Sequence, residues 1–140
     1  MAKSDRFTQQ HDELLVLANE LAASLDAEQL SENATPARSV LNKLAGRLLL
    51  HLGAEDEFLY PHLLTSNDEE TRQIAQRFVD EMGGIAQAFT AYNEKWKTSA
   101  SIQADAIGFI NETKSIYSAL TRRIEKENTI LYPLMDKGVA

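Results

Sequence analysis

Five ionisable side chains stand where the surrounding sequence pattern favours apolar residues. His11 lies on the apolar stripe of one amphipathic segment, and His51 and Glu55 share the stripe of the next. Arg123 and Glu127 share the stripe of the last segment. A buried charge without a partner is very costly, so these side chains must meet one another, bind a cation or reach water. Imidazoles and carboxylates are ligands for Fe(II), Zn(II) and Mn(II), so the pattern indicates a metal site or a buried ion cluster.

The spacing places the two histidines at nearly the same level of a helical hairpin. His11 lies ~26 Å of helix before the end of its segment, and His51 lies ~22 Å after the start of the returning segment. His51 and Glu55 are one turn apart and face the same way. Arg123 fits this geometry less well, and we expect the first turns of the last segment to overhang or to be irregular.

The chain contains an internal repeat. The pattern His51-x3-Glu55-x3-Leu59-Tyr60-Pro61 recurs as Arg123-x3-Glu127-x3-Leu131-Tyr132-Pro133. Met82 takes the place of His11 to within one position of the same offset. The repeat predicts two related helical hairpins, each of which contributes half of one central site.

Four amphipathic segments are expected to position these residues. Apolar side chains recur at helical spacing over residues 5–30, 36–64, 68–96 and 101–135, and Phe58 is expected to face the core. Gly83 and Gly84 interrupt the third segment, which a close helix approach or a local kink would explain. An all-α, up-down-up-down four-helix bundle, in one domain spanning residues 1–140, is the simplest arrangement.

Composition narrows the classes of partner. The net charge of −7 argues against nucleic acid, because phosphate binding needs a basic face. No apolar run approaches the ~18 residues of a membrane span, so no membrane partner is expected. Without cysteine there is no thiolate metal site, and without a leader-like start the expected location is the cytoplasm. An oligomer is compatible with the sequence.

These residues resemble the hemerythrin-like family, also called the HHE cation-binding domain, over essentially the whole chain. The resemblance rests on His11 in a His-Asp-Glu-Leu context, on His51-x3-Glu55 followed by Leu-Tyr-Pro, and on Glu127 followed by the same triplet. It implies a four-helix bundle with two irons, each bound by imidazoles of one hairpin, and two bridging carboxylates. It further implies that His11 and His51 bind one iron and that Glu55 and Glu127 are the bridging acids.

Two positions depart from the family pattern. The family places histidines, ligands of the second iron, where this chain has Met82 and Arg123. The guanidinium of arginine stays protonated and offers no lone pair, and a thioether is poorly matched to iron. The sequence therefore predicts at most one intact half-site, with Arg123 and Met82 at the lost one and no reversible O2 binding by a diiron pair.

Two outcomes are compatible with this loss. In one, a single metal, most simply iron with zinc or manganese as alternatives, is bound by His11, His51, Glu55 and Glu127, and Arg123 balances the charge. In the other, no metal is bound, and Arg123 and the histidines neutralise the two glutamates.

Taken singly, each residue also has an ordinary structural role. Tyr60 and Tyr132 are expected at the edge of the core with their hydroxyls hydrogen-bonded to water.

Three functions remain open at this level. The first is a non-enzymatic metal-binding domain in iron handling or in sensing O2, NO or redox state. The second is a metal-free bundle that serves as a structural or interaction module. The third, a non-heme iron oxidase or peroxidase-like enzyme, is least favoured. Neither a nucleophile–base constellation nor an open coordination position can be located for it.

Overall fold

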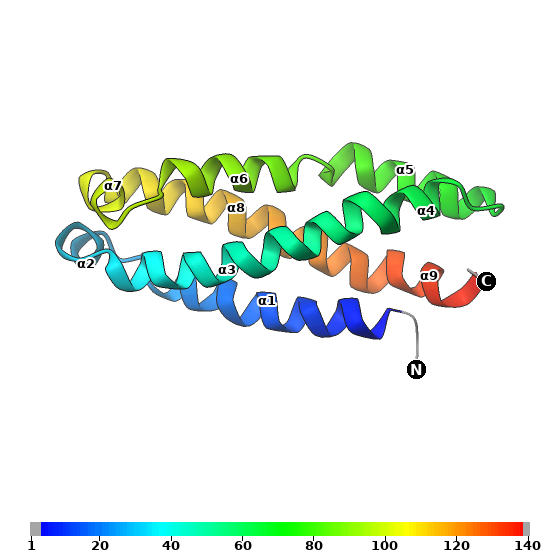
Figure 1. Ribbon diagram of the computed structural model, residues 1–140, viewed down its shortest axis with the longest axis horizontal. Helices are drawn as coiled ribbons and strands as arrows, with labels where there is room; N and C mark the ends of the chain where they lie inside the picture. Colours follow the sequence, from blue (N-terminus) through cyan, green and yellow to red (C-terminus); the bar gives the residue numbers. More distant parts are fainter. Residues whose placement is uncertain (1–3, 139–140) are drawn as a thin grey trace.

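The computed structural model describes residues 4–138, and all regular structure within this span is helical. The elements in chain order are α1 (Asp5–Ala23), α2 (Ala27–Glu32), α3 (Thr35–Ala54), the π-helical turn η1 (Glu55–Leu59), α4 (Tyr60–Leu64), α5 (Glu69–Met82), α6 (Ile85–Lys95), α7 (Ser99–Ala104), α8 (Ala106–Lys126), the π-helical turn η2 (Glu127–Leu131) and α9 (Tyr132–Gly138). Four antiparallel rods result, formed by α1, α3–η1–α4, α5–α6 and α8–η2–α9 (Figure 1). The predicted all-α, up-down-up-down four-helix bundle is confirmed.

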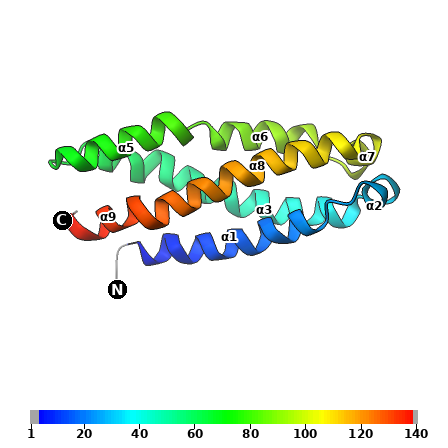
Figure 2. The ribbon, with the colours of Figure 1, turned by 180° about the vertical axis from the view of Figure 1, so that it is seen from behind.

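Each rod packs against two others. α1 contacts α3 and α8, and α6 contacts the same two helices from the opposite side. The start of α1 and the end of α9 lie at one end of the bundle, and the short helices α2 and α7 close the other end (Figures 1 and 2). In the described part of the chain, no helix combines the length and the apolar character needed to cross a bilayer.

The interior contains two apolar clusters, which lie one after the other along the length of the bundle. The larger one, toward α2 and α7, includes Leu14, Leu44, Leu48, Leu52, Phe89, Trp96, Phe109, Leu120 and Ile124. The smaller one, toward α4 and α9, includes Leu59, Leu63, Phe78, Met82 and Leu131. Along the fourth rod, Ile124 belongs to the larger cluster and Leu131 to the smaller, and buried Glu127 lies between them. The polar residues therefore interrupt the apolar interior midway along the bundle.

Polar caps divide two of the predicted segments. The sequence predicts one helix to residue 30, but α1 ends at Ala23 and Asp26 starts the separate helix α2 by accepting hydrogen bonds from the N–H groups of Glu28 and Gln29. In the fourth segment, Asp105 separates α7 from α8 and accepts from the N–H of Gly108. Such caps satisfy N–H groups that have no partner inside the helix. The irregular start expected for this segment is the break between α7 and α8.

The glycine pair marks a kink in the third rod. α5 ends at Met82 and α6 begins at Ile85. A Cβ atom on Gly83 would lie 2.5 Å from the main-chain oxygen of Val79, so a larger residue would force this turn to shift. Of the two explanations suggested by the sequence, the structure shows the local kink.

Both halves of the repeat contain a π-helical turn. The N–H groups of Tyr60 and Tyr132 donate to the carbonyls of Glu55 and Glu127, at the start of η1 and η2. A proline follows each tyrosine, and its ring lacks an N–H and clashes with the carbonyl one turn back, which favours the wider turn. Phe58 lies in η1 and is 71% exposed, so its predicted place in the core is wrong. The added residue in the turn changes which side chains face inward, and such turns are frequent at functional sites.

Candidate metal centre

Four side chains able to bind a metal converge midway along the bundle, and they are His11, His51, Glu55 and Glu127. Each offers one ligand atom, and these four atoms lie within 4.8 Å of one another. His51 is 4% exposed, and the other three are fully buried. The histidines come from α1 and from the end of α3, and the glutamates are the first residues of η1 and η2. The structure thus brings together the residues singled out from the sequence.

Each imidazole presents its Nε2 atom to a carboxylate. His51 Nε2 lies 3.0 Å from Glu55 Oε1, one turn along the same rod. His11 Nε2 lies 3.2 Å from Glu127 Oε1, which belongs to the other hairpin. The two ring centroids are 4.8 Å apart, so the histidines lie level, as the helix lengths predict.

The other nitrogen of each imidazole is held by a side-chain amide. His51 Nδ1 lies 2.6 Å from Gln10 Oε1, and His11 Nδ1 lies 2.7 Å from Asn128 Oδ1. An amide oxygen only accepts, so each Nδ1–H donates to its amide partner, and each Nε2 faces a carboxylate. Metal-binding histidines have this arrangement, because the outer partner fixes both the tautomer and the ring orientation.

The two tyrosines of the repeat exchange hydrogen bonds between the hairpins. Tyr60 donates to Glu127 Oε2, and Tyr132 donates to Glu55 Oε2, both at 2.6 Å. The Tyr132 hydroxyl also lies 3.0 Å from His11 Nε2. Both tyrosines are buried, so the expectation that their hydroxyls bind water at the edge of the core is wrong. Each phenol instead holds one carboxylate oxygen in place.

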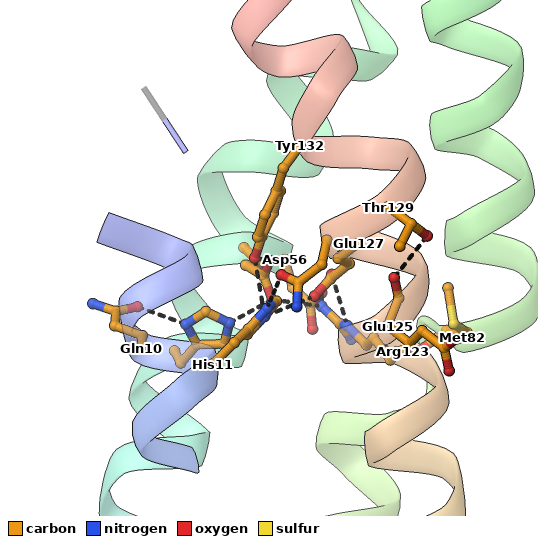
Figure 3. A network of polar contacts seen from close by, with 12 residues as sticks. Gln10, His11, Asp56, Met82, Arg123, Glu125, Glu127, Thr129 and Tyr132 are labelled. Carbon is orange, nitrogen blue, oxygen red and sulfur yellow. Dashed lines mark hydrogen bonds and ion pairs between the residues drawn. The ribbon is translucent and has the colours of Figure 1, made fainter. Parts of the chain in front are cut away.

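The Arg123 side chain occupies the side of the site that faces α5. Its Nε donates to Glu127 Oε2 at 3.1 Å, and its Nη2 donates to Glu55 Oε1 at 3.4 Å and to Asp56 Oδ1 at 2.9 Å. Its Nη1 donates to the main-chain oxygen of Met82 at 3.4 Å. Figure 3 shows Arg123 between the cluster and Met82, with His11 on the far side. The guanidinium is 1% exposed and its positive charge is paired with three acids.

Comparison with known families agrees with this geometry. A family model, the hemerythrin HHE cation-binding domain, matches residues 2–135, which is nearly the whole chain. The chain belongs to this family. Neither the curated proteins nor the solved structures include a significant match. In this hemerythrin HHE domain the metal-capable cluster contains two histidines and two glutamates, and Met82 and Arg123 stand where the family resemblance places further histidines.

Burial and ionic contacts act on the two acids of the HHE domain in opposite directions. Burial raises the pKa of Glu55 above its usual range. Glu127 is equally buried, but its contacts with His11 and Arg123 outweigh burial and lower its pKa. Burial also lowers the pKa of His11, but its contacts with Glu127 and Asn128 outweigh burial and raise the pKa. The acids around Arg123 raise its pKa despite burial, so its charge is permanent.

The donor set fits a divalent cation. His51 Nε2 and Glu127 Oε1 are buried and form no hydrogen bond among the described residues, although each lies at ion-pair distance from one atom, Glu55 Oε1 at 3.0 Å and His11 Nε2 at 3.2 Å. Such atoms are rare in proteins, and leaving one unpaired costs about 1–3 kcal/mol. The two atoms belong to His51 and Glu127, which are among the four residues that could bind the ion. A cation between these atoms would give each of them a partner. Two imidazole nitrogens and two carboxylate oxygens suit Fe(II), Zn(II) and Mn(II) alike.

Three polar residues of the site were not identified from the sequence, and they are Gln10, Asp56 and Asn128. Each is the neighbour in sequence of a candidate ligand, which is the one signal that could have drawn attention to them. None lies on an apolar stripe. Their side chains reach the site because each stands at the edge of the buried face and bends toward a partner from another helix or turn.

Proposed function

We propose that this HHE domain binds one divalent metal ion, iron, through His11, His51, Glu55 and Glu127. The observation that carries this proposal is the convergence of four buried ligand atoms, because two of the four residues present atoms with no hydrogen-bond partner. In both imidazoles the amide contact is at Nδ1, so that Nε2 is the atom that faces the carboxylates. Iron would supply a redox-active centre, and these residues would hold it.

Arg123 supports a single metal rather than two. Its guanidinium lies against Glu55 and Glu127 on the side where the family resemblance places the second iron. A fixed positive charge in a buried site repels a second cation at short range. It also offsets part of the negative charge that the two glutamates and Asp56 bring to the cluster.

The domain's role, in this proposal, is iron handling or the sensing of O2, NO or redox state. This role is supported by the burial of all four candidate ligands, because a centre closed off by side chains suits binding better than turnover. The donor set by itself does not select iron over zinc or manganese, so the metal has to be measured.

Quantitative elemental analysis of freshly purified protein from iron-replete medium tests the proposal. We expect close to one equivalent of iron per chain, lost on dialysis against a chelator and regained on adding Fe(II). Two equivalents would contradict the role given to Arg123. A protein that takes up no Fe(II), Zn(II) or Mn(II) would contradict the metal site itself.

Paired variants separate ligation from folding. Glu127→Gln keeps the size of the side chain but removes a ligand charge, and we expect the affinity for Fe(II) to fall by ~100-fold or more. Glu125→Gln, at an exposed position two residues before it on the same rod, is the matched control and should bind as the wild type does. An equal affinity in the two variants would exclude Glu127 as a ligand.

The role of the amide partners is tested in the same way. Gln10→Met removes the acceptor of His51 Nδ1, and we expect a 10- to 100-fold loss of metal affinity, roughly the range for residues that orient a ligand. Gln9→Met changes an exposed residue next to it and should have no effect. Equal affinities would show that Gln10 does not orient His51.

A second candidate, a metal-free bundle with a structural role, is favoured by the contacts of Arg123 alone. Arg123 pairs with Glu55, Asp56 and Glu127, so the acids already have a cationic partner. This candidate predicts that Glu127→Gln changes the free energy of unfolding and leaves metal content at zero. It also predicts that a chelator has no effect on thermal stability, whereas the metal-bound protein should lose stability.

A further inference from the structure

Beside the candidate metal centre, a cavity of about 580 Å³ that is open to solvent lies between α1 and α3. Its walls are largely apolar and include Phe7, Leu14, Leu50 and Ala54, and His51 and Gln10 line the same cavity. This volume is within the ~300–1,000 Å³ that is usual for small-molecule sites. The cavity is separate from the four-atom cluster, because it lies on the side of His51 where Gln10 holds Nδ1.

Two arginines give the cavity a charge that is unusual for this protein. Arg6 and Arg47 line it together with one acid, Glu13, so the charged groups of the lining have a net positive charge in a chain whose net charge is −7. Both are exposed, so they border its solvent side. Arg47 pairs with Glu13 at 3.2 Å, with 59% and 50% of the two side chains exposed, and such an exposed pair is weak and exchangeable. Arg6 has no ion pair among the described residues.

The shape and charge of the cavity define one class of ligand. The apolar walls suit an aliphatic chain, and the guanidinium groups suit a carboxylate, which they bind in a forked geometry. The carboxylate would remain at the solvent side, because burying an unpaired charge among Phe7, Leu14 and Ala54 is costly. Leu50, which is 78% exposed, would then be covered by the chain of the ligand.

We propose that this cavity binds an amphipathic monocarboxylate of medium chain length, with its carboxylate on Arg6 and Arg47 and its chain against Phe7 and Leu50. This site is beyond the proposed metal-binding function and does not require it. The bound chain would lie against His51, a candidate metal ligand, and would cover its solvent-facing side.

Calorimetric titration with octanoate, on both chelator-treated and metal-loaded protein, tests the proposal. We expect saturable binding in both forms, so a protein that binds octanoate but no metal would contradict only the proposed metal site. We also expect octanol, which has the same chain but no charge, to bind at least ~10-fold more weakly. Octanol binding as tightly as octanoate, or no octanoate binding at millimolar concentration, would overturn the proposal.

Variants locate the site. Arg6→Gln and Arg47→Gln should each weaken octanoate binding by about 2- to 5-fold, the range for one exposed ion pair, and the double variant by ~10-fold. The matched control is Arg77→Gln, an exposed arginine on α5, which should leave binding unchanged. A double variant with wild-type affinity would overturn the assignment to this cavity.

A second copy of the chain is the competing occupant, since exposed Leu50 could equally be covered by another protein surface. Sedimentation velocity of the wild type and of Leu50→Gln distinguishes the two. We expect both to be of the same size and Leu50→Gln to bind octanoate more weakly. A wild-type dimer that Leu50→Gln converts to a monomer, with no effect of octanoate, would overturn the proposal.

Discussion

The two hairpins of the bundle share a backbone plan and differ in the chemistry that they bring to the centre. The first hairpin (residues 5–64) contributes His11, His51 and Glu55, and the second (residues 69–138) contributes Glu127 and Arg123 at the equivalent places. Both contain a π-helical turn that begins at the glutamate and is followed by Tyr-Pro. The turns position the acids in both hairpins, so the backbone geometry is alike although the described part of the second hairpin contains no histidine.

The comparison also shows how the halves depend on each other. Tyr60 of the first hairpin holds Glu127, and Tyr132 of the second holds Glu55. Asn128 of the second hairpin holds His11 of the first. Each candidate half-site is therefore oriented largely by the opposite hairpin, and the second hairpin still serves the first although it offers no imidazole of its own.

The largest effect is expected from returning histidines to the second hairpin. The double variant Met82→His with Arg123→His removes the fixed charge and adds two imidazoles, so iron content should rise from about one to about two equivalents per chain. Elemental analysis of protein purified from iron-replete medium measures this. If the content stays near one equivalent, the two positions are not equivalent to those of the first hairpin.

Removing only the positive charge of Arg123 should lower the stability of the metal-free protein, because the buried acids lose their partner. Arg123→Met leaves Glu55, Asp56 and Glu127 without their cation, and we expect the free energy of unfolding to fall by about 3–5 kcal/mol. Urea unfolding in the presence of a chelator measures it. Arg122→Met, at an exposed neighbouring position, should change it by less than ~0.5 kcal/mol. Similar losses in both variants would show that the pairing of Arg123 with the acids is energetically unimportant.

The crossed tyrosines should contribute less, and unequally. Tyr60→Phe and Tyr132→Phe each leave a buried carboxylate oxygen short of a donor, at a cost of about 1–3 kcal/mol. The larger loss is expected for Tyr132, whose hydroxyl also contacts His11 Nε2. Urea unfolding with Tyr117→Phe as control tests this, because the Tyr117 hydroxyl donates to Asn19 at an exposed position. A larger loss for the control would contradict the role of the buried phenols.

The smallest effect concerns the far end of the second hairpin. Hydrogen bonds from Lys95 and Trp96 hold the pKa of Glu112 below its usual range despite some desolvation. A carboxyl group whose pKa is lower in the folded than in the unfolded state stabilises the protein at pH values above the unfolded-state pKa. This contribution to stability is lost as the pH falls through the folded-state pKa. We therefore expect Glu112→Gln to lower the midpoint of thermal unfolding at pH 7 and to differ less from the wild type in acid. A difference independent of pH would contradict this.

The overall fold could be predicted from the sequence because it depends on local periodicity. Leu44, Leu48 and Leu52 recur at helical spacing, and a stripe of this kind must be buried against other helices. The same reasoning wrongly placed Phe58 in the core, because a π-helical turn changes the direction in which the side chains within it point. The breaks at Asp26 and Asp105 were missed for a related reason, since each depends on a single capping side chain.

The sequence by itself determined that His11, His51, Glu55, Arg123 and Glu127 lie on the apolar stripes of helices in a bundle, and it predicted from this that they meet at one site. Only the tertiary structure decided which atoms face each other. Gln10 and Asn128 hold the outer imidazole nitrogens, and the tyrosines cross between hairpins. Such pairings depend on the rotation of one rod against another, to which linear spacing is insensitive. The orientation of each imidazole, on which the proposed metal site depends, follows from that packing.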